Sequence, residues 1–139
     1  WSIMEFDGVD TSGTNGSGAI AQSNSTGAFP SATASTTLTN APGGTSATYG
    51  AAQFNVGTST TSPGTGFTEV HEQSSAGKVV NLETEWRSDA VQTISATNTS
   101  SANNSMSGIE IKATAAAAAA PPRHGALLSG IRNQVIQRV

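Results

Sequence analysis

Short segments of alternating side chains, separated by turn residues, constrain the fold of this chain more than any other feature. The segments recur every ten to fifteen residues or so, which is the spacing of strands in a β-sandwich or barrel. Charged residues make up only 11% of the chain, and Ser, Thr, Gly, Ala and Asn dominate the rest, which disfavours a soluble helical protein. The pattern predicts strands over residues 2–7, 17–23, 32–39, 46–56, 67–73, 78–88, 90–97 and 106–113.

Residues 80–87 alternate between two rows, as a half-buried strand does. One row is Val80, Leu82, Thr84 and Trp86, and the other is Asn81, Glu83, Glu85 and Arg87. We expect the first row to face the core, with Trp86 as its anchor, and the second row to face solvent, with Arg87 countering a glutamate. Residues 107–112 alternate in the same manner, so the last strand also has a wet and a dry face. Turns are predicted at residues 10–13, 42–44 and 62–66, where Asp, Pro and Gly cluster.

Charge divides the chain into an acidic body and a basic end. Residues 1–120 hold nine acidic and three basic side chains, a net charge of −6, whereas residues 121–139 hold three arginines and no acid, a net charge of +3. An acidic body disfavours nucleic-acid binding, which requires clustered Lys and Arg. Cysteine is absent, which excludes disulfides and thiolate zinc sites, and no run approaches the ~20 apolar residues of a membrane span.

The C-terminal region changes character at Thr114. Six alanines and then Pro121-Pro122 follow it, and we interpret residues 114–122 as a spacer, because the prolines prevent a helix from continuing. Residues 123–139 show helical spacing of apolar side chains, and a helix this short needs a surface to lie on. That surface is the chain's own sandwich, another protein chain or a membrane surface, and we expect another protein chain. The predicted partner-binding residues are Leu127, Leu128, Ile131, Arg132, Val135 and Val139.

Two acidic groupings raise the question of a calcium or catalytic site. Asp7 and Asp10, with Glu5 nearby, could supply oxygens to calcium, but Asp10 before Thr-Ser-Gly is also the pattern of an ordinary Asx-turn, which we favour. Glu83 and Glu85 lie two residues apart, about 6.5–7 Å along a strand, which suits the carboxyl pair of a glycosidase. A solvated strand face is the commoner arrangement, so a hydrolase is the least favoured hypothesis.

His71 stands beside Glu69 and Glu72, which suggests a metal site or a proton relay. On a regular strand, however, Glu69 and His71 share a face and Glu72 lies on the other. The second histidine, His124, is far away in the tail, so we expect no metal and no cofactor. Glycosylation sequons at Asn15, Asn24, Asn98 and Asn103 follow from the Asn/Ser/Thr-rich composition.

Four segments, in their order and spacing, resemble a β-sandwich module of phage structural proteins and secreted bacterial surface proteins. They are residues 4–13 (MEFDGVDTSG), 63–73 (PGTGFTEVHEQ), 82–87 (LETEWR) and 108–112 (GIEIK). The resemblance covers about residues 2–113 and implies a jelly-roll or concanavalin-like sandwich displayed on a particle or cell surface, without an established catalytic site. Members of that family usually carry further strands ahead of the first segment. We therefore expect those strands either to be missing here or to be supplied by neighbouring copies.

Together these observations predict an all-β protein: an antiparallel jelly-roll-like β-sandwich in residues 1–113, an Ala/Pro linker in 114–122 and a short amphipathic docking helix in 123–139. The predicted function is that of a non-enzymatic virion component, such as a capsid decoration, head-fibre or tail-fibre subunit, on the virion surface or extracellular. Its expected partners are other particle proteins and copies of itself, with a trimer suggested by the resemblance. The alternative is a secreted carbohydrate-binding module with Trp1, Tyr49 or Phe54 as stacking residues.

Overall fold

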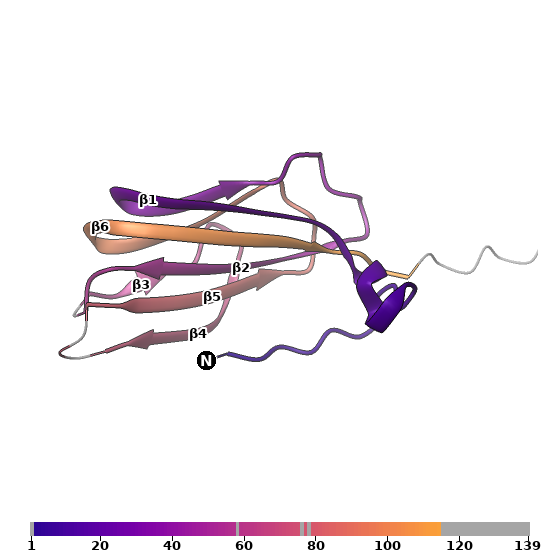
Figure 1. Cartoon of the computed structure of the whole chain (residues 1–139), viewed down its shortest axis with the longest axis horizontal. Coiled ribbons are helices and arrows are strands. Elements are labelled where there is room, and N and C mark those ends of the chain that lie inside the picture. The colour runs from indigo at the N-terminus through magenta and orange to yellow at the C-terminus, as the bar shows by residue number, and fades with distance from the viewer. Residues whose placement is uncertain (1, 58, 76, 78, 115–139) are drawn as a thin grey trace, which may run out of the picture.

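A computed structural model describes residues 2–57, 59–75, 77 and 79–114. Within them the chain is all-β, and its strands form one antiparallel six-stranded sheet in the order β1-β6-β2-β5-β4, with β3 paired to β6 (Figure 1). The all-β antiparallel prediction is therefore confirmed. The alanine and proline residues of the predicted linker and the predicted docking helix, with its six partner-binding residues, lie outside the described residues.

Two of the strands are much longer than predicted. The elements are η1 (Thr14–Ala19), β1 (Ile20–Thr37), β2 (Ala47–Phe54), β3 (Thr61–Ser62), β4 (Thr68–Ser74), β5 (Asn81–Arg87) and β6 (Thr93–Ile111). The predicted strands 17–23 and 32–39 fall together in β1, and 90–97 and 106–113 fall together in β6. The short β3 was not predicted.

Residues 2–7 are not a strand, which corrects the sequence prediction. Their alternation has a different cause, because the segment runs extended across the outer face of the sheet and turns every second side chain toward it. Backbone pairing to the sheet begins just after this segment. An isolated bridge pairs Val9 with Ala113, and the Asp10 N–H donates to the Lys112 carbonyl (2.9 Å).

The strands β1 and β6 double back on themselves, as Figure 1 shows at one end of the molecule. The Asn24 side chain donates to the Thr37 carbonyl (2.7 Å), and the Thr26 hydroxyl donates to that of Thr36 (3.2 Å), so the two halves of β1 lie close together. Register shifts in the β1–β6 pairing between Gly27 and Thr33 accompany the bend, as expected of β-bulges.

The core lies between these halves. Its largest apolar members, Phe54, Leu38, Ile94 and Met106, are at most 1% exposed. Ile94, on the first half of β6, packs over Gly108 on the second half, where an added Cβ would overlap the Ile94 side chain. Gly50 on β2 leaves room for the same isoleucine. Small residues in the sheet therefore allow the doubled-back halves to approach each other closely.

The predicted turns at residues 42–44 and 62–66 are confirmed by backbone bonds that close them. The Ser46 N–H donates to the Gly43 carbonyl (3.1 Å), and the Phe67 N–H donates to the Gly64 carbonyl (2.9 Å). In the part of the chain that the structure describes, no helix has the length and apolar character needed to cross a bilayer.

Candidate functional site

The two faces of β5 are the reverse of the sequence prediction. Glu83 and Glu85 are fully buried, and so is Asn81, whereas Leu82 is 42% exposed and Trp86 is only half-buried. The predicted alternation is present in β5, but the row of Asn81, Glu83 and Glu85, which we expected to face solvent, faces the interior.

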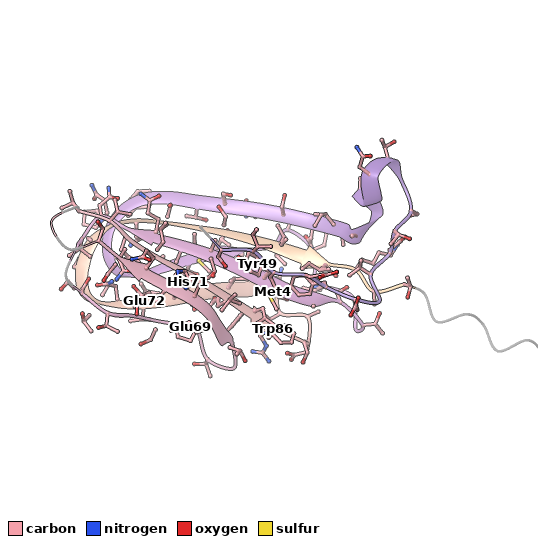
Figure 2. The ribbon with its side chains drawn as sticks, turned by 90° about the horizontal axis from the view of Figure 1, so that it is seen from below. Met4, Tyr49, Glu69, His71, Glu72 and Trp86 are labelled. Carbon is pink, nitrogen blue, oxygen red and sulfur yellow. The ribbon has the colours of Figure 1, made fainter. Side chains whose placement is uncertain are left out.

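Trp86 lies on the outer face because the N-terminal segment supplies an apolar cover there. The Phe6 ring packs edge-on against Trp86 and Tyr49, with centroid distances of 6.2 and 6.4 Å. Figure 2 shows Met4, Tyr49 and Trp86 grouped under this segment. Trp86 thus anchors the contact between the N-terminal segment and the sheet rather than the core.

The buried glutamates are covered by residues 59–64, which cross the inner face of the sheet. The Gly64 N–H donates to Glu85 Oε2 (2.6 Å), and the Thr61 N–H donates to Glu72 Oε1 (2.7 Å). The Asn81 side-chain amide also donates to Glu72 Oε1 (3.1 Å) and to the Ser59 carbonyl (2.5 Å). We call Glu72, Glu83 and Glu85 the glutamate cluster.

Burial leaves Glu83 and Glu85 short of hydrogen-bond partners and raises the pKa of each carboxyl. Neither oxygen of Glu83 has a partner among the described residues, and Glu85 Oε1 also lacks one. Burial, reinforced by the charges of Glu85, Glu69 and Glu72, raises the pKa of Glu83 to about 8. Burial raises the pKa of Glu85 to about 7, although the bond from Gly64 opposes the change. Both carboxyls therefore hold their protons at mildly acidic pH.

A β-bulge explains why Glu69 and Glu72 share a face, contrary to the prediction. The register of β4 on β5 shifts between Glu69, which opposes Glu85, and His71, which opposes Thr84, so Glu72 then opposes Glu83. Glu69 and Glu72 therefore face the same way as the buried glutamates, and His71 lies on the outer face (Figure 2). No group of three or more acidic or histidine side chains able to hold a metal ion occurs in the described ranges.

The geometry of the glutamate cluster does not suit a glycosidase. Such an enzyme needs its two carboxyls on either side of a sugar, with one of them ionised. Here Glu83 and Glu85 are 0% exposed, and backbone N–H groups of the covering segment bind Glu85 and Glu72. Arg87 does not counter a glutamate as predicted, because it pairs bidentately with Asp89 (both 2.7 Å).

The other predicted site residues also have defined places. Asp10 forms the predicted Asx-turn by accepting the Ser12 N–H (2.9 Å), and it pairs with Lys112 (2.9 Å). Phe54 is 0% exposed, which excludes it as a platform for a sugar ring. Asn98 is 2% exposed and donates to Thr61, so its sequon is inaccessible in the folded chain.

A second feature, which the sequence interpretation missed, is an apolar hollow of about 500 Å³ between the N-terminal segment and the sheet. Its main lining residues are Ile3, Met4, Ile20, Tyr49 and Ile109, and we call it the N-terminal groove. Ile3 is 76% exposed and Ile20 is 46% exposed. The clue in the sequence was the apolar residues Ile3, Met4 and Phe6, which the sequence analysis placed in a strand over residues 2–7.

No protein-family model, no curated protein and no solved structure matches this chain.

Proposed function

We propose that this chain is a non-enzymatic structural module of a surface assembly, such as a decoration or fibre subunit of a virus particle. In this proposal residues 1–113 form a jelly-roll-like β-sandwich that faces outward, and the C-terminal segment attaches it to the assembly. The doubled-back halves of β1 and β6, with Ile94 packed between them, support the sandwich architecture.

The observation that carries the proposal is the closed state of the glutamate cluster. Glu83 and Glu85 are the carboxyl pair that the strand spacing suggested for a glycosidase, and both are buried beneath residues 59–64. Side chains held in this way contribute to the interior of the fold and are not accessible to a polymeric substrate. The exposed surface of β1 is uncharged and largely polar, since its first half exposes mostly Ser, Thr and Asn.

Deletion of residues 121–139 tests the proposal directly. In fractions from the source that produces the chain, we expect the intact chain to sediment with particles and the truncated chain to remain free. Far-ultraviolet circular dichroism checks that the truncated protein keeps its strand signal. Sedimentation of both forms with particles, or of neither, would refute anchoring through the tail.

The same pair of proteins distinguishes the other hypotheses. A free carbohydrate-binding module would bind glycans on an array and keep that affinity after truncation. A hydrolase would turn over a polysaccharide and lose turnover in Glu83→Gln and Glu85→Gln. Either result would replace the structural proposal.

A further inference from the structure

The N-terminal groove offers an apolar surface that the described residues leave open. Its volume of about 500 Å³ lies within the range of binding pockets, and its lining is almost entirely apolar. Two of its isoleucines, Ile3 and Ile20, are among the few large apolar side chains that the described residues expose. Apolar side chains along a hollow of this size can be covered by an apolar segment of a partner.

The chain leaves the fold next to this groove. The Thr114 N–H donates to the Gly8 carbonyl (2.8 Å), and Ala113 pairs with Val9, which lines the groove. The wall formed by residues 2–9 and the end of β6 are therefore fixed together at the point where the C-terminal segment begins.

Charge around the groove is acidic. Glu5 and Asp7 are exposed on the same wall, and neither forms an ion pair with a described residue. Residues 121–139 carry Arg123, Arg132 and Arg138 and no acid. Residues 121–139, which combine apolar side chains with positive charge, are thus complementary to an apolar groove with an acidic wall.

We propose that the N-terminal groove binds residues 126–139 of a second copy of this chain, and so joins copies head to tail. Leu128, Ile131 and Val135 enter the groove, and Arg132 meets the acidic wall. A contact of this kind joins two different surfaces, so it closes into a ring when the rotation between copies permits. The inference rests on the proposed function in that both use the same C-terminal segment.

The spacer favours a second copy over the chain's own groove. Eight residues, 115–122, separate Thr114 from the tail, and Pro121-Pro122 favours an extended path. On an extended path of ~3.1 Å per residue, eight residues reach about 25 Å. Because the spacer starts beside its own groove, an extended path would carry residues 126–139 past that groove and toward a neighbour.

The oligomeric state of the full chain tests the proposal. Sedimentation velocity over a range of concentrations should show an oligomer that dissociates to the 13.9 kDa monomer in Ile131→Glu and in Ile3→Arg. Val79→Arg is the matched control, since Val79 is 70% exposed, close to the value for Ile3, and does not line the groove. It should keep the wild-type mass. Circular dichroism confirms that all variants are folded.

Mixing the two defective variants separates the possible outcomes. Ile3→Arg keeps an intact tail and Ile131→Glu keeps an intact groove, so the mixture should form a one-to-one dimer that neither variant forms alone. A full chain that is monomeric at every concentration would overturn the inference. This includes a monomer whose tail is protected from protease, because that tail would occupy the groove of its own chain. An oligomer that survives both substitutions would also overturn it. Particle sedimentation is scored separately, so a chain that forms oligomers without joining particles refutes the proposed function and leaves this inference standing.

Discussion

The substitution Glu83→Gln should make the protein more stable, and the gain should grow with pH. Glutamine has nearly the same shape as a protonated glutamate but carries no proton to lose. The pKa of Glu83 is about 8 in the folded protein, and its ordinary value is 4.5. The folded state thus retains a proton that the unfolded chain releases over this range.

The sign and size of the effect follow from this difference. Below pH 4.5 both states hold the proton, and the wild type has its full stability. As the pH rises from 4.5 to about 8, ionisation lowers the free energy of the unfolded chain, so the free energy of unfolding falls by about 1.4 kcal/mol per pH unit. For Glu83 the loss is about 3 kcal/mol at pH 7 and about 4 kcal/mol at pH 8, and it approaches about 5 kcal/mol at higher pH. Glu83→Gln removes this loss.

Urea unfolding at pH 4.5, 6, 7 and 8.5, followed by circular dichroism, measures the effect. The two proteins should have similar stability at pH 4.5, and the variant should exceed the wild type by several kcal/mol at pH 8.5. The control is Glu5→Gln, which changes the same group at an exposed position and should track the wild type. Parallel curves for Glu83→Gln and the wild type across this range would refute the buried, protonated state of Glu83.

Three further substitutions probe other contacts. Glu72→Ala should destabilise the fold by about 1–3 kcal/mol, because the buried Thr61 N–H loses its acceptor, and limited proteolysis should then cut within residues 57–66. Phe6→Ala should release the N-terminal segment and shift tryptophan emission to longer wavelength, measured in a Trp1→Phe background; an unchanged spectrum would contradict the packing. Gly108→Ala should cost about 1–3 kcal/mol in thermal or urea unfolding, and Ile94→Val should restore part of the loss by removing the overlapping methyl group.

The sequence predicted the β-rich class and most strand positions, because turn chemistry and period-two alternation are local properties. The segments 46–56, 67–73 and 78–88 correspond to β2, β4 and β5, with ends that differ by a few residues. The Asx-turn at Asp10 followed from its own side chain and its next neighbours. Merging of predicted strands into β1 and β6 was not predictable, because the bend keeps the backbone extended through Ser/Thr/Asn-rich segments that resemble turns.

The candidate site depended on contacts distant in sequence. Alternation assigns side chains to two faces but does not say which face is inside, and hydrophobicity alone gave the wrong answer for β5. Two segments distant in sequence from β5 determined which face is inside. Residues 2–9 covered the row that contains Trp86, and residues 59–64 covered the row that contains Glu83.

By itself, the sequence determined that this chain forms alternating strands and that it has an acidic body and a basic end with apolar residues at helical spacing, since each of these depends on neighbouring residues alone. Only the tertiary structure decided that two glutamates lie in the interior and that an apolar groove opens beside the chain's exit at Thr114. The physical reason is that burial and proton affinity depend on what packs against a side chain, and here the packing partners lie about 20 to 80 residues away.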